Sequence, residues 1–355
     1  MKTNRFISVL VIVLSILVLS SCATAVKKVD GDKALSLWTD DAQAKKELIS
    51  YMDAITDPNS PDYIPVNRRI AVFDFDGTLF CETDLDYFDH SLLVYRVTVD
   101  EEYKSQASDF EKQVANEIIE KSQTSSPVGG LDVPHGQAVA SAFKGMTPQQ
   151  FIDYIQIFKK TSMPHYTGMN RGDGFYLPML EVVNYLIDND FTVFIVTGTD
   201  RYILRGIFYD SPLSFIPPAQ IIGSEQSLVV ESQGDPNGLE YTFKADDTVV
   251  FGGEFLVKNL KTNKVFIIVK EIGLQPVLSF GNSSGDASMH EYTINNNPYR
   301  SLAFMLCCDD LDRENGNEKK ANDMYSQCAE FGWAPISMKN DWTTIYGDNV
   351  TYIKK

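Results

Sequence analysis

Four short apolar segments, separated by stretches that contain amphipathic helices, restrict the fold of this chain most strongly. They are residues 70–75, 191–198, 276–281 and 301–306, and each is six to eight residues long. Apolar segments of this length are typical of strands that are buried on both faces. Segments with helical spacing lie next to three of them, at 177–190, 264–273 and 317–332. Strands that alternate with helices predict a three-layer α/β fold, with helices on both faces of a largely parallel sheet.

Two insertions interrupt this alternation. The first, about residues 83–178, contains helical segments at 109–123 and 147–160 and a loop rich in glycine and proline, so we expect a mostly helical cap after the first strand. The second, at 227–254, alternates polar and apolar residues around turn residues, which predicts one or two hairpins. An insertion that directly follows a strand with catalytic groups is well placed to cover them.

The acidic composition excludes one class of partner. The chain has 31 lysines and arginines against 48 aspartates and glutamates, a formal net charge of -17. No basic stripe is present to neutralise a nucleic-acid backbone, so we expect no nucleic acid as a partner. An acidic surface is also repelled by an anionic membrane, so membrane attachment would have to be covalent or inserted.

The N-terminus has the features of a secretory signal. Lys2 and Arg5 precede fourteen largely apolar residues, 6–19, fewer than the roughly 20 that a spanning helix needs. The sequence LSSC that ends at Cys22 resembles the lipobox of bacterial lipoproteins. This resemblance implies that residues 1–21 are removed and that a lipid on Cys22 anchors the chain in the bacterial cell envelope, facing the periplasm or the outer membrane. The alternative is an ordinary signal peptide that is cut shortly after Cys22, with that cysteine incidental.

These patterns divide the chain into parts. After the signal segment, we expect a polar tether and then one helix over residues 34–55. The predicted parts are a signal peptide at 1–21, the tether and N-terminal helix at 22–66, a core made of 67–82 and 179–355, and the cap at 83–178.

The remaining cysteines and the four histidines give no metal motif. No cysteine or histidine pair has ligand spacing, so we expect the histidines to be structural or exposed. The remaining cysteines are expected to be small buried hydrophobic residues: Cys81, Cys307, Cys308 and Cys328.

Two carboxylates stand at the tip of the first apolar segment. Asp74 and Asp76 follow a buried strand, where an unpaired charge is costly. Two carboxylates in one crevice can divide the work of a two-step phosphoryl transfer. One attacks phosphorus, and the other protonates the leaving alcohol and then takes a proton from water. Gly77 permits a tight turn behind them.

The other parts that this chemistry needs follow in order along the chain. Thr197 ends the second apolar segment and offers a hydroxyl. Lys264 stands at the start of a helix, and for that reason we prefer it to Lys258 and Lys261 as the cation. The segment 281–286 ends the next strand and supplies amide and carboxylate oxygens, which suit Mg²⁺.

Together these segments resemble the four motifs of the haloacid dehalogenase (HAD) superfamily of aspartyl-phosphate hydrolases, over residues 70–306. The matching segments are DFDGT at 74–78, VTG at 196–198, Lys264, and GNSSGD at 281–286. The resemblance implies a Rossmann-like core in which Asp74 is the nucleophile and Asp76 the general acid and base. Dehalogenase members lack the second aspartate and P-type ATPases carry threonine there, so Asp76 implies a phosphatase.

The same resemblance assigns the remaining roles. Thr197 and Lys264 would stabilise the phosphoryl group, with Thr78 and Gly198 beside it. The ligands of the implied Mg²⁺ would be Asp74, Asp76, Asn282 and Asp286.

The first insertion resembles the C1-type helical cap of phosphoserine phosphatase and phosphocholine phosphatase relatives in size and place. Phosphoserine phosphatases hold the substrate amine with a glutamate in this region, which makes Glu82 a candidate for that role. The alternative is that Glu82 belongs to a solvated acidic turn. Arg171, in the loop that closes the cap, is a candidate for a substrate contact.

One departure from the family pattern matters. Asn282 stands where the fourth motif usually has its first aspartate, so we expect weaker metal binding. The sequence therefore favours an envelope-anchored, Mg²⁺-dependent phosphomonoesterase that acts on a small phosphorylated metabolite, with no protein partner. Two alternatives stay open: a non-catalytic lipoprotein that binds a ligand on this scaffold, and a phosphotransferase or mutase.

Overall fold

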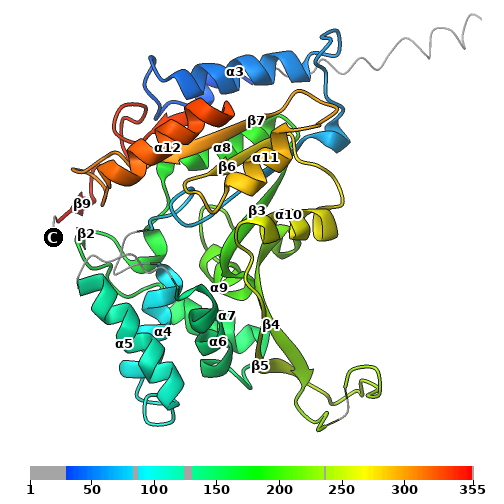
Figure 1. Cartoon of the computed structure of the whole chain (residues 1–355), viewed down its shortest axis with the longest axis vertical. Helices are drawn as coiled ribbons and strands as arrows, with labels where there is room; N and C mark the ends of the chain where they lie inside the picture. The colour runs from blue at the N-terminus through cyan, green and yellow to red at the C-terminus, as the bar shows by residue number, and fades with distance from the viewer. Residues whose placement is uncertain (1–28, 83–86, 124–129, 236, 354–355) are drawn as a thin grey trace, which may run out of the picture. The chain divides into compact units, whose positions relative to one another are not determined.

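A seven-stranded sheet forms the centre of the described part of the chain, which comprises residues 29–82, 87–123, 130–235 and 237–353 of this computed structural model (Figure 1). Its strands, in spatial order, are β5 (Val249–Val257), β4 (Ile221–Val230), β3 (Thr192–Asp200), β1 (Ile70–Phe73), β6 (Leu278–Gly281), β7 (Leu302–Cys307) and β8 (Ala334–Ser337). Every neighbouring pair is parallel except β4 and β5. The predicted α/β fold with a largely parallel sheet is thus confirmed. The predicted signal segment and Cys22 lie outside the described residues.

Helices surround this sheet. They are α2 (Gly31–Ala34), α3 (Gln43–Thr56), α4 (Phe88–Thr98), α5 (Asp109–Gln123), α6 (Asp132–Ala142), α7 (Pro148–Phe158), α8 (Leu177–Asp188), α9 (Arg201–Phe208), α10 (Thr262–Ile267), α11 (Ala287–Ile294) and α12 (Glu318–Phe331). In the view of Figure 1, α10, α11 and α12 lie in front of the sheet and α8 lies behind it. The amphipathic segments that the sequence indicates at 109–123, 147–160, 177–190 and 317–332 are all helical.

Alternate residues of the strands pack into two apolar layers. On one face, Met305 and Cys307 of β7 pack with Met324 and Cys328 of α12. Cys307, Cys308 and Cys328 are free thiols, and Cys81, Cys307 and Cys328 are buried. On the opposite pleat, three phenylalanine rings stack across adjacent strands, with centroid distances of 4.3 Å between Phe73 and Phe280 and 4.9 Å between Phe280 and Phe304. Such cross-strand aromatic rows fix the register of the central strands.

Four cap helices, α4 to α7, lie between β1 and α8 in the chain, in the region where the sequence predicts a helical cap. Figure 1 shows them gathered beyond one end of the sheet, near the β4–β5 hairpin. The second insertion forms this one hairpin, which packs on α6. A Cβ at Gly136 of α6 would stand 2.5 Å from the Phe255 ring, so only glycine allows this close approach.

The prediction of one helix over residues 34–55 is wrong at its start. The structure has the short helix α2, an irregular segment, and then α3. Trp38 is buried and pairs in an antiparallel bridge with Trp342, and its indole Nε1 donates a hydrogen bond to the carbonyl of Pro178 at 3.0 Å. These tertiary contacts need an extended backbone at Trp38, and they override the local helical spacing.

The chain also forms a second, smaller sheet. A two-stranded antiparallel sheet pairs β2 (Tyr166–Thr167) with β9 (Thr351–Tyr352). Among the described residues, no helix is both long and apolar enough to cross a membrane.

Candidate active site

The candidate site lies where three neighbouring central strands end. Asp74 directly follows β1, Gly198 lies near the end of β3, and Asn282 directly follows β6. Because β1 lies between β3 and β6 in a parallel sheet, their carboxyl ends open at one edge, the usual location of ligand sites in such sheets. The Asp74 amide donates to the carbonyl of Phe280 at 2.9 Å, which ties the first motif to the strand before the fourth.

The turn after Asp74 is built around one glycine. Gly77 has a φ of +76°, and a Cβ there would stand 1.9 Å from Nδ2 of Asn282. Both the left-handed backbone and the close approach therefore require glycine. The Phe75 side chain is fully buried and stacks on the Phe80 ring at 4.8 Å. Phe75 is thus held in the apolar core, while Asp74 and Asp76 on either side of it line the cavity.

Lys264 joins the first and fourth motifs. Its Nζ donates to Oδ1 of Asp74 at 2.5 Å and to Oδ1 of Asp286 at 2.7 Å, and its side chain is fully buried. Burial alone would lower the pKa of Lys264, but the carboxylates of Asp286 and Asp74 outweigh it and raise that pKa. Lys261 is exposed instead. Among the three candidate lysines, Lys264 is thus the one paired with Asp74.

Asp286 holds the loop that carries Asn282. Its Oδ2 accepts hydrogen bonds from the backbone amides of Asn282 at 3.0 Å and Ser283 at 3.2 Å. Burial would raise the pKa of Asp286, but Lys264, His290 and the Asn282 amide outweigh it, so that pKa is lowered and the group is ionised. Both carboxylate oxygens of Asp286 are therefore engaged within the protein.

The two aspartates of the first motif have unusual protonation behaviour. Burial, together with the nearby carboxylate of Asp286, raises the pKa of Asp74 to about 7, although Lys264 opposes the shift. Burial and the carboxylates of Asp89 and Asp74 raise the pKa of Asp76 well above its usual range. Oδ2 of Asp76 accepts a hydrogen bond from the Thr199 hydroxyl at 2.7 Å, whereas its buried Oδ1 has no partner within the described part of the chain. An aspartate that favours its protonated form suits an acid catalyst.

Glu82 is engaged in a network of its own. Its carboxylate accepts hydrogen bonds from Nζ of Lys320, at 2.7 Å and 3.0 Å, from the Tyr87 hydroxyl at 2.9 Å, and from Nδ2 of Asn282 at 3.0 Å. Lys320 belongs to α12, so this network links that helix to the first and fourth motifs. The Asn282 amide group donates to Glu82, which orients Asn282 in the site.

A cavity of about 800 Å³ opens over these groups. Its volume is in the range of small-molecule sites. Carboxylates of the core line it, and so do four lysines: Lys121, Lys258, Lys319 and Lys320. Cap residues such as Ser122 and Leu131 form part of the wall. The cavity therefore lies between core and cap, with cations around a carboxylate-rich floor.

The structure brings most of the expected site residues together. Those that line the cavity are Asp74, Asp76, Glu82, Gly198, Asn282 and Asp286. Lys264 lies directly behind the carboxylates. Thr78 and Thr197 are fully buried and do not line it, and the Thr197 hydroxyl accepts a hydrogen bond from the Thr199 amide at 3.1 Å.

Arg171 lies outside the cavity. It begins a short 3₁₀ helix at Arg171–Asp173, and its guanidinium stacks on the Phe158 ring at 5.2 Å. Arg171 is therefore not placed to contact a substrate in this cavity, contrary to what the sequence had led us to expect. The loop closes against cap helix α7, where the apolar ring attracts the guanidinium.

The structure also adds residues that the sequence analysis did not single out. Thr199 contacts Asp76, and Lys320 pairs with Glu82. Asp89 and His90 of α4 line the cavity beside them. Thr199 could have been found from the sequence, because it lies only two residues beyond Thr197 in the same strand.

Comparison with known proteins shows a shared fold. No protein-family model matches the chain, and no curated protein matches it significantly. A conserved protein of unknown function from Anaerococcus prevotii DSM 20548 has a TM-score of 0.51 at 13% identity, over 86% of this chain and 95% of that one. A cytosolic 5'-nucleotidase IIIB bound to cytidine has a TM-score of 0.47 at 10% identity, over 84% and 90%. A phosphoserine phosphohydrolase-like protein from Francisella tularensis subsp. tularensis SCHU S4 has a TM-score of 0.35 at 16% identity, over 67% and 87%. The likeness to the Anaerococcus protein shows that the two chains share their fold.

Proposed function

We propose that this chain is a phosphomonoester hydrolase of the HAD type, which acts through an aspartyl phosphate on Asp74. The observation that carries the proposal is the contact of Lys264 with both Asp74 and Asp286 at the floor of the cavity. It joins three separate sequence motifs into one ion-paired group, beside a second aspartate that favours its protonated form.

In the first step, an oxygen of the Asp74 carboxylate attacks the phosphorus of a phosphate monoester. The bond between phosphorus and the alcohol oxygen breaks, and its electron pair stays on that oxygen. The oxygen takes the proton of the Asp76 carboxylic acid, so the alcohol leaves neutral and Asp74 carries the phosphoryl group. Lys264, behind Asp74, favours the ionised form that attacks.

In the second step, water attacks the phosphorus of the aspartyl phosphate. The ionised Asp76 takes a proton from this water, and the bond between phosphorus and the Asp74 oxygen breaks. Inorganic phosphate leaves, and both aspartates return to their starting states. The Thr199 hydroxyl, which donates to Asp76, stabilises the ionised form that this step needs.

The donor set beside Asp74 fits Mg²⁺, which prefers oxygen ligands. Asp74, Asp76 and Asn282 line the same cavity, and each offers a side-chain oxygen that this ion could bind. Asp286 has both oxygens engaged, so we assign it to holding the Asn282 loop rather than to direct ligation. When bound, Mg²⁺ supplies positive charge that offsets the charge of the phosphoryl oxygens.

The cavity suits a small anionic metabolite. Its four lysines complement phosphate and further anionic groups, and its volume admits a substrate of metabolite size. Glu82 already pairs with Lys320, so a substrate amine would have to displace that lysine to reach it. We therefore favour a substrate without an amine at this position over an amino-acid phosphate.

A phosphate-release assay tests the function. The full chain is incubated with p-nitrophenyl phosphate and a panel of phosphomonoesters, with Mg²⁺ and with a chelator. We expect release that depends on Mg²⁺. Ligand-dependent thermal stabilisation without any turnover would favour the non-catalytic alternative, and turnover only with an added alcohol acceptor would favour phosphotransfer.

Replacing Thr199 with valine is expected to slow turnover. The variant loses the hydrogen bond to Asp76, and bonds to charged groups contribute about 1.5–3 kcal/mol, so kcat should fall about tenfold or more. Steady-state kinetics with p-nitrophenyl phosphate measure the change. Thr192→Val, at the exposed start of the same strand, is the matched control and should keep wild-type activity. If Thr199→Val and Thr192→Val were equally active, Thr199 would have no role in the mechanism.

We also propose that Cys22 carries a lipid anchor in the bacterial envelope, on the strength of the charged, apolar and LSSC segments before it. Cells fed labelled palmitate should incorporate label into the wild-type chain, which should fractionate with membranes. The Cys22→Ser variant should lose both the label and the membrane association. An unlabelled wild-type chain would favour the ordinary signal peptide.

A further inference from the structure

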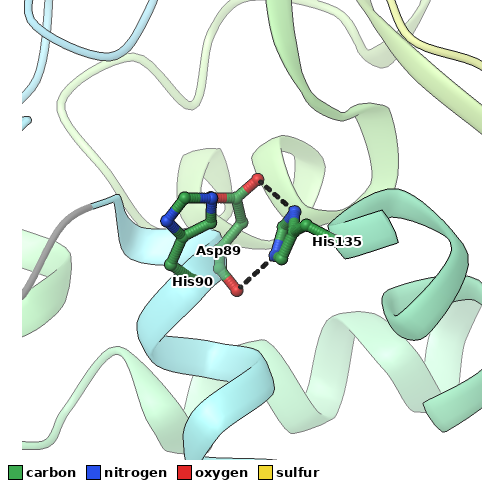
Figure 2. A group of neighbouring side chains, drawn as sticks. All are labelled: Asp89, His90 and His135. Carbon is green, nitrogen blue, oxygen red and sulfur yellow. Dashed lines mark hydrogen bonds and ion pairs between the residues drawn. The ribbon is translucent and has the colours of Figure 1, made fainter. Parts of the chain in front are cut away.

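Two histidines and an aspartate meet at the edge of the cavity, on two cap helices. Asp89 and His90 lie at the start of α4, and His135 lies on α6 (Figure 2). Their exposed fractions are 4%, 6% and 2%. One ligand atom of each lies within 4.8 Å of the others. Asp89 and His90 also line the cavity, so an ion can reach the cluster from that side.

The hydrogen bond of His135 defines which of its nitrogens carries the proton. Nε2 of His135 lies 3.2 Å from the backbone carbonyl oxygen of Asp89. A dashed line marks this contact in Figure 2. A carbonyl oxygen only accepts, so Nε2 donates and, in a neutral imidazole, Nδ1 has the free lone pair. Nδ1 faces Oδ2 of the Asp89 carboxylate at 3.8 Å. Two acceptor atoms thus face each other at a distance too long for a hydrogen bond.

Two other polar atoms of the cluster have no hydrogen-bond partner among the residues that the structure describes. They are Oδ1 of Asp89 and Nδ1 of His90, and both are buried. Leaving such atoms unpaired costs free energy, so native proteins rarely do it without a ligand or water. His90 is buried, and in the neutral form that burial favours its imidazole offers a lone pair. Each of the three side chains therefore presents an electron pair to one small volume.

We propose that Asp89, His90 and His135 bind a Zn²⁺ ion, distinct from the Mg²⁺ beside Asp74. Two imidazoles and one carboxylate form a donor set that Zn²⁺ favours, whereas Mg²⁺ prefers oxygens alone. Bonds of about 2.1 Å in a tetrahedral site place ligand atoms about 3.4 Å apart, so small side-chain rotations suffice to close the cluster. Three protein ligands leave a fourth position open, as in zinc sites that bind a water or a substrate atom.

The ion would affect both the cap and the catalytic acid. It would join α4 to α6, two helices that are far apart in sequence. Oδ2 of Asp89 lies 3.4 Å from the Thr199 hydroxyl, which also contacts Asp76. The bound cation would neutralise Asp89, one of the carboxylates that act on Asp76. The site does not depend on the proposed phosphatase activity, because none of its ligands belongs to the catalytic set.

Zinc stoichiometry tests the proposal. The full chain is stripped with a chelator, dialysed against low Zn²⁺ in a large excess of Mg²⁺, and analysed for bound zinc. We expect one Zn²⁺ per wild-type chain and loss of that ion in His90→Gln and His135→Gln. The matched controls are His165→Gln, outside the cluster, and Cys308→Ser, on the same cavity wall, and both should retain the ion. Asp74→Asn should also retain it, which separates the two metal sites.

Cobalt substitution gives a second readout. Co²⁺ in a four-coordinate site of nitrogen and oxygen ligands gives strong visible absorption, and we expect this spectrum in the wild type and its loss in Asp89→Asn. His90→Gln, at the cavity wall, serves if His135→Gln fails to fold. A wild-type chain that binds no zinc would overturn the proposal. Zinc or cobalt binding that is unchanged in the cluster variants would do the same.

Discussion

Replacing Asp74 with asparagine is expected to abolish phosphate release from p-nitrophenyl phosphate. The amide keeps the shape of the side chain but has no carboxylate to attack phosphorus, and removal of a nucleophile costs about 10⁴-fold or more in kcat. Asp286 still pairs with Lys264 in this variant, so the buried lysine keeps a counter-ion and the fold should persist. Thermal unfolding of the variant checks this.

The matched control is Asp323→Asn. Asp323 lines the same cavity from α12 and pairs with Lys319, but it lies outside the catalytic group. This variant carries the same chemical change and should retain activity within a few-fold of wild type. If Asp74→Asn and the wild type released phosphate at equal rates, Asp74 would not be the nucleophile.

Replacing Lys264 with alanine is expected to destabilise the whole fold. Lys264 is fully buried between Asp74 and Asp286, and removal of one partner of a buried ion pair costs about 3–5 kcal/mol, because it leaves uncompensated charge. Urea unfolding in the presence of a chelator measures the loss. Lys261→Ala is the control, because that neighbouring lysine is exposed and surface substitutions change stability by about 0.5 kcal/mol or less.

The destabilisation should depend on pH, with a sign that follows from the charges. Without Lys264, burial and mutual repulsion raise the folded-state pKa values of Asp74 and Asp286 above those of the unfolded chain. A carboxyl group whose pKa is higher in the folded than in the unfolded chain stabilises the fold when it is protonated. The loss of stability relative to the wild type should therefore be smallest in acid and should grow as the pH rises through the raised pKa values. Asp286→Asn in the same chain should restore part of the loss. A deficit that is unchanged by pH and by this second substitution would contradict the charge-pair account.

The residues at the floor of the site could be predicted from the sequence because they lie close together along the chain. Asp74, Asp76 and Gly77 lie within one turn after a buried strand, and Asn282 and Asp286 lie within another. Parallel strands bring their carboxyl ends to one edge, so strand order alone places these two turns together. The sequence also favoured Lys264 over the neighbouring Lys258 and Lys261, because Lys264 stands at the start of a helix, and the structure shows it paired with Asp74.

The rest of the site depends on contacts that spacing does not reveal. Glu82 and Lys320 are 238 positions apart, and His135 is 46 positions from Asp89. Cap packing brings the latter pair together, and isolated histidines in a sequence are more often structural than ligands. In the N-terminal segment a distant contact made the sequence-based prediction wrong. The local spacing around Trp38 predicted a helix, but Trp38 pairs with Trp342 in an antiparallel bridge instead.

The aspartyl phosphate itself is the most direct test of the proposed mechanism. An Asp76→Asn variant should still form it from p-nitrophenyl phosphate, because p-nitrophenolate leaves without an acid, but should hydrolyse it slowly because the general base is missing. After an acid quench and trypsin digestion, mass spectrometry should find the peptide of residues 70–96 heavier by one phosphoryl group, with the modification on Asp74. Phosphate release without any adduct, or an adduct on another residue, would contradict the account.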